Sequence, residues 1–264
     1  TESVGIARRL RDLQVDIGPQ EEVKEGILRK LAPIFDMWED MRTGDGGKYL
    51  EEPHGDLDPL ELFVQSEMRL AVELFRTIDG TMSKVKRSLY GSKALVSSAV
   101  KKEAEALQKG AVPISWQKKW DNDEESIAAY LNDAKRRYSF VMDLGRAGGR
   151  LLETKINLRM LFRPRVFLSA LRQAAARDLR VGMNELEPVS TFGRRLDTDC
   201  RIIARLDGFY LRGAVAQGDR LVEVADLPQR MDVCELSFRP TRKEKRGLAD
   251  GVLSLPVYDS DERG

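Results

Sequence analysis

Few residues in this chain have the chemistry expected of a catalytic or metal site. The only histidine, His54, lies in a loop rich in Gly, Pro and Asp, and the two cysteines, Cys200 and Cys234, are distant from it in the sequence. This set is too small for a zinc site, and a catalytic triad would need the histidine to be buried beside a nucleophile. We therefore expect an exposed loop histidine, two cysteines packed as small apolar side chains, and no catalytic, cofactor-binding or metal-binding residue.

The glycine-rich segment Gly145–Arg150 is superficially similar to a phosphate-binding loop. It lacks the Gly-Lys-Ser/Thr ending of such loops, and it follows a predicted helix rather than a strand. Its backbone amides are therefore not arranged to cradle a phosphate. A helix end or a close contact between helices is the better interpretation. The neighbouring carboxylates Glu51 and Glu52, or Asp58 and Glu61, are expected in loops or at helix caps and need no catalytic role.

The densest basic run is Arg239–Arg246, between two predicted strands. A solvated hairpin tip explains this run, and docking onto an acidic surface of a neighbouring domain or subunit is the alternative. Aromatic residues are not interleaved with it, which disfavours a single-stranded nucleic-acid site.

Two tryptophans, Trp116 and Trp120, lie four residues apart behind Pro113. This spacing places them on one face of a short turn. We expect a hydrophobic plug at one end of a helical bundle, with ligand stacking as the less favoured alternative.

The composition is that of an ordinary globular protein. Among 264 residues, 42% are hydrophobic and 33% are charged, and the net charge is +1, so no global field favours nucleic acid or an anionic membrane. Two cysteines fit a reducing compartment, and no apolar run approaches the length of a membrane span or a signal peptide. The chain begins at Thr1 without Met, so we expect it to be a piece of a longer protein.

Apolar residues three and four apart predict a helical first part. Helices are expected over residues 1–15 and 21–42, separated by Gly18-Pro19, with Pro33 kinking or dividing the second. The longest stripe lies on a helix that starts at Asp58 and Pro59 and ends at Gly91-Ser92. Its apolar positions are Val64, Met68, Ala71, Phe75, Ile78, Met82, Val85 and Leu89.

Three further helices are predicted by the same periodicity. One spans about 92–109, with Gly110 as its stop. Another begins with Asp123 as its cap and carries the buried positions Ile127, Leu131, Ala134, Tyr138, Val141 and Met142. The last follows an extended piece at 158–163, begins near Pro164, and buries Val166, Phe167, Ala170, Leu171, Ala174 and Ala175.

The remainder has a strand period. After a single turn at Asn184–Glu187, short β-rich segments occur at Arg201–Leu206, Phe209–Val215, Arg220–Val224, Asp232–Phe238 and Gly251–Tyr258. The predicted fold class is therefore α+β: an N-terminal helical bundle followed by a small antiparallel β-barrel, whose closure stays open because the last strand has no evident partner. The expected sections are 1–42, 58–187 and 188–264.

Three segments, in this order and spacing, are similar to the C-terminal region of dynein heavy chains. They are Val-Pro-Ile-Ser-Trp-Gln-Lys-Lys-Trp at 112–120, Leu-Phe-Arg-Pro-Arg-Val-Phe-Leu-Ser-Ala-Leu-Arg-Gln at 161–173, and Leu-Ser-Leu-Pro-Val-Tyr at 253–258. The likeness covers nearly the whole sequence. Among dyneins it resembles the second cytoplasmic class, the motor of retrograde intraflagellar transport.

The resemblance implies a helical segment that follows the sixth AAA+ module and leads into a small β-barrel on one face of the motor ring. Residues 1–42 would join that last module. The implied partners are the AAA+ modules of the same heavy chain, with the motor assembly and the microtubule reached through other regions, and no nucleic acid or membrane. The resemblance implies no cofactor in this chain, ATP and Mg in the full-length motor, and a location in the cytoplasm, the cilium or flagellum, and the cytoskeleton.

The function implied is mechanical: a cap that bridges ring modules and tunes force, processivity or ATPase rate. No Walker sequence is present, so no catalytic residue is assigned. The alternative is a free-standing α+β ligand-binding or interaction module with a small molecule in its barrel. An enzyme with Cys200 or Cys234 as nucleophile is the least favoured class, because no histidine lies near either cysteine.

Overall fold

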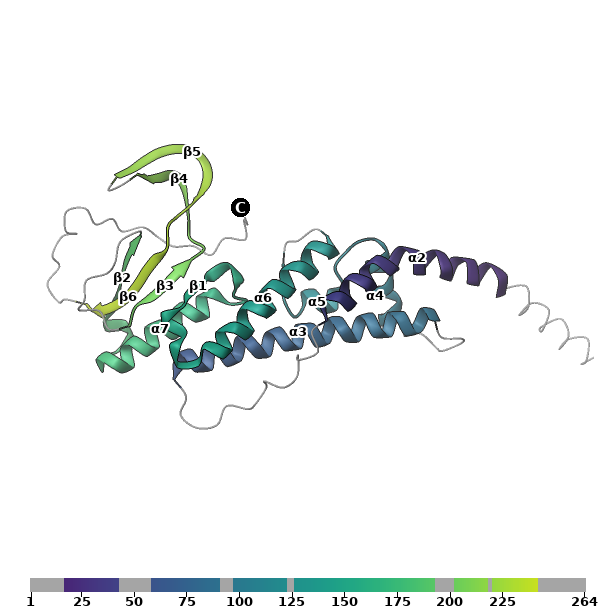
Figure 1. The fold of residues 1–264 in the computed structure, drawn as a ribbon, viewed down its shortest axis with the longest axis horizontal. Helices are drawn as coiled ribbons and strands as arrows, with labels where there is room; N and C mark the ends of the chain where they lie inside the picture. The colour runs from purple at the N-terminus through teal and green to yellow at the C-terminus, as the bar shows by residue number, and fades with distance from the viewer. Residues whose placement is uncertain are drawn as a thin grey trace, which may run out of the picture. The chain divides into compact units, whose positions relative to one another are not determined.

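The computed structural model describes most of the sequence, drawn as coloured ribbon in Figure 1. The described residues are 17–42, 58–90, 97–122, 126–192, 202–217 and 220–241. Several predictions concern residues outside these ranges: the helix at 1–15, the environments of His54, Glu51, Glu52 and Cys200, the Asp123 cap, residues 242–246 of the basic run, and the strand at 251–258.

The described residues fall into two compact units. The first contains residues 17–42 and 72–135, and the second contains 58–71 and 136–241, each within the described ranges. The three sections expected from the sequence, 1–42, 58–187 and 188–264, stay a prediction.

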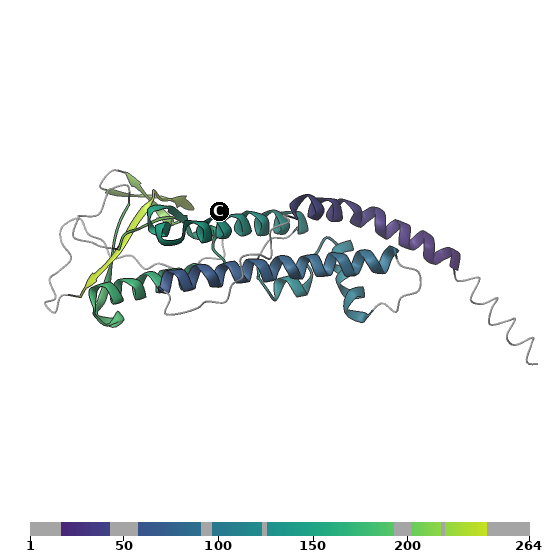
Figure 2. The same cartoon turned by 60° about the horizontal axis from the view of Figure 1, so that its bottom comes forward.

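The first unit is helical. Its elements are α2 (Ile17–Met41), the later part of α3 (Pro59–Tyr90), α4 (Ser98–Gln108), the short α5 (Ile114–Gln117) and the first part of α6 (Ile127–Ala147). α2 is longer than predicted, because Gly18 and Pro19 lie in its first turn, where the missing N–H of proline costs nothing. Figure 2 shows α2 as one continuous helix, so Pro33 does not divide it.

Local chemistry explains where these helices begin and end. The Asp58 carboxylate accepts a hydrogen bond from the Leu60 amide at 2.8 Å, which caps α3 at the predicted place. α6 begins at Ile127, and the Ser126 hydroxyl accepts from the Ala129 amide at 3.2 Å, so the described cap lies three residues after the predicted Asp123. After α4, Gly110 has a φ of +73°, the left-handed backbone expected of its predicted stop.

The predicted apolar stripes are confirmed as buried faces. On α3 every position of the stripe from Val64 to Val85 is buried, and only Leu89, in the last turn, is half-buried. On α6 all six predicted positions are buried. The stripes therefore identified the core side of both long helices correctly.

The second unit combines helices and strands. α6 continues into the 3-10 helix η1 (Gly148–Glu153), and then come β1 (Lys155–Asn157), η2 (Leu158–Met160), α7 (Pro164–Leu179) and η3 (Met183–Glu185). The strands that follow are β2 (Leu186–Phe192), β3 (Ala204–Asp207), β4 (Tyr210–Gln217), β5 (Arg220–Arg230) and β6 (Cys234–Pro240). The single turn predicted at 184–187 is η3, one residue earlier.

The strands form two sheets, and those of the described ranges do not close into a barrel. The larger sheet has the order β1-β3-β6-β2, and β4 pairs only with β5 in a separate two-stranded sheet. β1 runs parallel to β3, so the larger sheet is mixed, whereas the sequence predicted an antiparallel one. The short strand β1 and the Pro-containing β2 were missed because neither has a long alternating pattern. The α+β class itself is confirmed.

Because there is no closed barrel among these strands, five apolar side chains of the predicted strands have different environments. Leu206 is fully buried, Ile202, Leu211 and Leu236 are half-buried, and Val222 is exposed. Leu211 and Val222 belong to the two-stranded sheet, which explains why they do not share a core with Leu206.

α7 lies against the larger sheet, contacting β6, as Figure 1 shows. Its buried positions are Phe167, Ala170, Leu171, Ala174, Ala175 and Ala176. The prediction that Val166 is also buried was wrong, since its side chain is 42% exposed. Val166 is adjacent to Phe167 in the sequence, and neighbouring helical residues point in directions about 100° apart.

Candidate functional site

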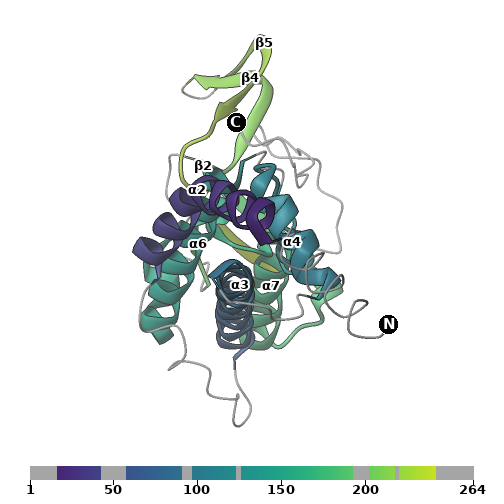
Figure 3. The same ribbon diagram turned by 90° about the vertical axis from the view of Figure 1, so that its right-hand side faces the viewer.

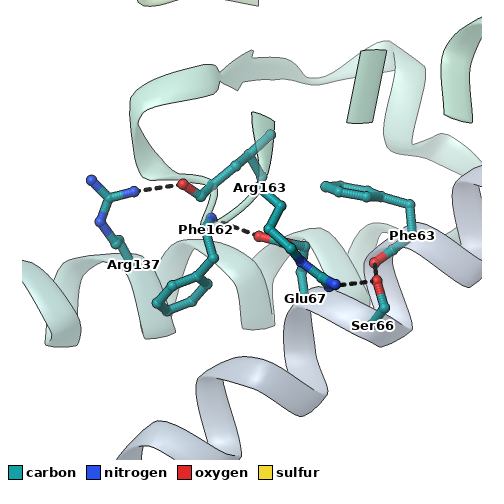
Figure 4. A network of polar contacts seen from close by, with 7 residues as sticks. Phe63, Ser66, Glu67, Arg137, Phe162 and Arg163 are labelled. Carbon is teal, nitrogen blue, oxygen red and sulfur yellow. Dashed lines mark hydrogen bonds and ion pairs between the residues drawn. The ribbon is translucent and has the colours of Figure 1, made fainter. Parts of the chain in front are cut away.

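The most elaborate polar arrangement surrounds residues 161–163, which connect η2 to α7 (Figure 4). The Phe162 amide donates to Oε2 of Glu67 at 2.7 Å, and Nε of Arg163 donates to Oε1 of the same carboxylate at 3.0 Å. From α6, Nη1 of Arg137 donates to the Leu161 carbonyl oxygen at 2.6 Å. Three consecutive residues are thus held by side chains of two different helices, and we call this arrangement the joint.

The sequence around the joint explains its backbone. Pro164 is at the first position of α7, which disfavours a helical conformation at Arg163, and Arg163 has φ −135° and ψ 71°. An extended backbone between two helices makes no ladder bonds of its own, so its amide and carbonyl groups need other partners. Glu67 and Arg137 supply these partners to Phe162 and Leu161.

Apolar packing encloses the joint. Leu161 and Phe167 are buried, and the Phe167 ring lies against that of Phe63 on α3, with centroids 5.2 Å apart. The Arg163 guanidinium also donates to the Ser66 hydroxyl at 2.8 Å, and that hydroxyl donates to the Phe63 carbonyl oxygen at 2.7 Å. The joint therefore ties the start of α7 to α3 through both polar and aromatic contacts.

The environment of Glu67 is unusual for a carboxylate. Its side chain is 0% exposed, and burial raises its pKa by more than the hydrogen bonds from Phe162 and Arg163 lower it. The Arg163 side chain is 41% exposed, so the positive partner keeps contact with water. A charge in this position is costly without its partners, which makes Glu67 sensitive to any change in the joint.

A second buried carboxylate, Asp207, lies at the end of β3. Its Oδ2 accepts from Nη2 of Arg230 at 2.7 Å and lies 3.2 Å from Nζ of Lys155, while its Oδ1 accepts from the Gly208 amide at 2.7 Å. Burial acts to raise its pKa, but these three hydrogen bonds together hold it below the usual value. Asp207 thereby links β1, β3 and β5.

The two tryptophans form part of an aromatic cluster in the first unit. The Tyr130 ring stacks on Trp116 at a centroid distance of 5.9 Å and lies 5.1 Å from that of Trp120, and its hydroxyl donates to the Trp120 carbonyl oxygen at 3.0 Å. Burial raises the pKa of Tyr130. Trp116 is fully buried and Trp120 nearly so. The burial agrees with the predicted plug and leaves no ring face open for ligand stacking.

The structure also places the other residues that the sequence singled out. Cys234 is buried in β6, and burial raises its thiol pKa to about 12, so the thiol is neutral and a poor nucleophile. A Cβ added to Gly145 would lie 2.5 Å from Sδ of Met68, and Gly148 begins η1 with φ +53°. The glycine-rich segment is thus both a close helix contact and a helix end.

Of the basic run, Arg239 and Pro240 end β6, and the Arg239 guanidinium pairs with Glu187 on β2. Within the described ranges, no group of three or more His, Cys, Asp or Glu side chains is arranged to hold a metal ion. No described helix is both long and apolar enough to cross a membrane.

The sequence interpretation missed Glu67, Arg137 and Asp207. Glu67 and Arg137 each had a signal, because they interrupt the buried faces of amphipathic helices. Glu67 lies one turn after Phe63, directly before Met68, and Arg137 lies next to Tyr138 on α6. A charged residue on a buried helical face needs a partner, although the identity of the partner is not visible in the sequence. Asp207 directly follows the strand predicted at Arg201–Leu206 and had no comparable signal.

Comparison with known proteins agrees with the resemblance seen in the sequence. The family model that describes the C-terminal domain of dynein heavy chains matches residues 12–264. Cytoplasmic dynein 2 heavy chain 1 of Tripneustes gratilla is 28% identical over 244 residues, and that of Homo sapiens is 27% identical over 241 residues; both alignments cover 89% of this sequence. A cytoplasmic dynein heavy chain of Caenorhabditis elegans is 25% identical over 240 residues, or 90% of the sequence.

The matched region is a small part of each relative, 6% of the first two and 5% of the third. The family model, in contrast, spans nearly all of this sequence. The protein therefore belongs to the family of C-terminal domains of dynein heavy chains.

Proposed function

We propose that this protein is the non-catalytic C-terminal part of a dynein heavy chain of the cytoplasmic dynein 2 class. In this proposal it caps the AAA+ ring of its own heavy chain and tunes force and processivity during minus-end-directed transport along microtubules, in retrograde intraflagellar transport. The family match over residues 12–264, together with relatives named as cytoplasmic dynein 2 heavy chains, carries the proposal.

The joint supports a mechanical role. Glu67, Arg137 and Arg163 are engaged with one another or with backbone groups of residues 161–163, and the surrounding side chains are apolar. Such an arrangement fixes one element against another, since a displacement of the segment would take the Phe162 and Arg163 donors away from the buried Glu67 carboxylate. A domain that transmits force needs fixed connections of this kind.

The wider assignments are part of the same proposal. The protein itself takes no cofactor, while ATP and Mg serve the full-length motor. Its partners are the AAA+ modules of the same heavy chain, and the motor assembly and microtubule are engaged through other regions, without nucleic acid or membrane. The corresponding location is the cytoplasm, the cilium or flagellum, and the cytoskeleton.

The test is a single-molecule motility assay of the heavy-chain motor with and without this region. We expect deletion to change run length, velocity or stall force, and the point variant Glu67→Ala to change them in the same direction. Glu67→Gln is the matched control, because it keeps an acceptor for the Phe162 amide in a side chain of the same shape. Unchanged velocity and processivity after deletion would contradict the proposal, as would ATP hydrolysis by the isolated 264-residue protein.

A further inference from the structure

The two-stranded sheet β4–β5, here called the ribbon, projects away from the larger sheet in both Figure 1 and Figure 3. β4 pairs with β5 from Tyr210↔Arg230 to Arg212↔Pro228 at its base and, after an irregularity between Arg212 and Ala214, from Ala214↔Glu223 to Gln217↔Arg220 at its tip. Among the elements that the structure describes, neither strand packs along any third one. An isolated pair of strands is only marginally stable in water.

Contacts at the base hold the ribbon. Asp207 at the end of β3 bonds Arg230 at the end of β5, and Nη1 of Arg159 donates to the Tyr210 hydroxyl at 2.6 Å with its guanidinium 5.3 Å from the ring centroid. The Phe209 ring also lies edge-on to that of Phe192 on β2, with centroids 5.8 Å apart. The attachment is therefore mostly polar, with one aromatic contact.

The backbone leading into the ribbon is suited to a change of direction. Gly208 has φ +98°, a conformation that other residues rarely adopt, and it lies between Asp207 and the first residues of β4. A Cβ at Gly208 would lie 3.0 Å from Oδ1 of Asn157 and 3.2 Å from Cγ of Arg159. A glycine therefore lies where the backbone leaves the larger sheet, directly beside the carboxylate that fixes the ribbon.

The charges at the base differ in their exposure. The Asp207 side chain is 4% exposed, whereas those of Arg230 and Lys155 are 62% and 50% exposed. If the ribbon moved away, Arg230 would be solvated at once, while the Asp207 carboxylate would keep only Lys155 on β1 and the Gly208 amide as partners. Release of the ribbon is therefore opposed mainly by the cost of leaving the Asp207 carboxylate incompletely paired, and less by the loss of a partner for the exposed cation.

From these observations we propose that the ribbon is a hinged arm, pinned to the larger sheet by the ion pair of Asp207 with Arg230, and that Gly208 provides its pivot. When the pin is weakened, the ribbon changes its angle to the sheet as an intact two-stranded unit. This proposal concerns the 264-residue protein itself and does not rest on the proposed motor function, so each can fail independently of the other.

The experiment measures the distance between two spin labels in the 264-residue protein. One label is placed at Gln173→Cys, on the exposed side of α7, and the other at Val222→Cys, on the exposed part of β5; Cys200→Ser removes one competing thiol, and Cys234 is buried. In the parent protein we expect a narrow distance distribution. In Asp207→Asn we expect a broader distribution with a shifted second population.

Glu223→Gln is the matched control, because it removes the same charge from an exposed position on the ribbon, away from its base. This variant should keep the parent distribution. Amide exchange supplies a second measurement: the Gly208 amide, which donates to the Asp207 carboxylate, should exchange on the order of tenfold faster in Asp207→Asn, as expected when a charge-assisted bond is lost. The amides paired across the ribbon should keep their protection.

A folded Asp207→Asn variant with the parent distance distribution would overturn the proposal, and so would loss of protection across the whole ribbon, because the ribbon would then unfold rather than swing. If Asp207→Asn does not fold, the distance distribution is measured in the double variant Lys155→Gln with Arg230→Gln instead. This variant alters only the two half-exposed cations. A broadened distribution in that variant supports the hinge, and an unchanged one overturns it.

Discussion

The joint at residues 161–163 and the base of the ribbon use the same chemistry in different surroundings. Each has a buried carboxylate paired with an arginine, Glu67 with Arg163 and Asp207 with Arg230. The joint is enclosed by Leu161, Phe167 and the aromatic contact with Phe63, whereas the ribbon has no described element packed along it. An ion pair thus fixes a segment when apolar packing surrounds it, and only pins one end of a segment that lacks such packing.

The pKa values of the two carboxylates are also shifted in opposite directions. Burial dominates at Glu67 and raises its pKa. At Asp207 burial acts in the same direction, but the hydrogen bonds from Arg230, Lys155 and Gly208 outweigh it and lower the pKa. The surroundings of Glu67 therefore favour its neutral form more than water does, whereas the surroundings of Asp207 favour its charged form.

The largest expected effect comes from removing the apolar surroundings of the joint. Phe167→Ala should lower the free energy of unfolding by about 3 to 5 kcal/mol, because the ring is fully buried and its removal leaves a cavity beside Phe63. Chemical denaturation measures this change. Val166→Ala, at the exposed neighbouring position, should be close to neutral; a near-neutral result for Phe167→Ala instead would mean that apolar packing does not distinguish the joint from the ribbon.

Removing the carboxylate of the joint should have the next largest effect. Glu67→Ala leaves the Phe162 amide without its acceptor and should cost about 1 to 3 kcal/mol in denaturant unfolding. Glu67→Gln keeps an acceptor and removes a buried charge, so we expect it to cost clearly less. Equal losses for the two variants would show that the charge, rather than the hydrogen bond to the backbone, is what stabilises the joint.

A smaller loss is expected at the base of the ribbon. Asp207→Asn should lower the global free energy of unfolding by at most about 1 kcal/mol, since its cationic partners are largely solvated. Thermal or denaturant melting measures this value, and Glu223→Gln again provides the control. A loss as large as that of Glu67→Ala would show that the base of the ribbon is fixed as firmly as the joint, which would contradict the difference between the two regions.

The smallest and most specific effect is the dependence of stability on pH. The folded pKa of Glu67 lies above its usual 4.5, so the folded state binds this proton more tightly than the unfolded state, and the contribution of Glu67 to stability rises as pH falls. The folded pKa of Asp207 lies below its usual 3.8, so its contribution is present above that value and is lost as pH falls through the folded pKa.

These opposite signs are measured by comparing variants across a pH series. The stability difference between the parent protein and Glu67→Gln should grow in favour of the parent as the solution is acidified. The difference between the parent and Asp207→Asn should shrink over the same range. If the two stability differences changed with pH in the same direction, this result would contradict the opposite pKa shifts of the two carboxylates.

The sequence predicted the helical part well because its signals are local. The stripe on α3 and the face of α6 repeat over many turns, and Asp58 and Pro164 have strong preferences at helix starts. The helix break predicted at Gly18 and Pro19 was wrong, because both residues fit the first turn of α2.

The sheet arrangement could not be derived from local patterns. β1 has three residues and pairs with β3, from Lys155↔Arg205 to Asn157↔Asp207, across a long sequence separation that includes α7. The partners of Glu67 and Asp207 are equally distant, and the pairing of distant charges is decided by the tertiary fold. The separation of β4–β5 from the other strands likewise depends on the pairing partners and not on the strand pattern.

The division of the second unit into residues before 72 and residues after 135 has a consequence for how the protein folds during its synthesis. Glu67 leaves the ribosome 95 residues ahead of Phe162, whose amide donates a hydrogen bond to the Glu67 carboxylate. At usual rates of translation this is a delay of about 5 to 20 s. During that delay the start of α3, with Phe63 and Glu67 on one face, is complete while the residues that cover it do not yet exist. The last part of this unit to be made therefore decides when its first part becomes stable.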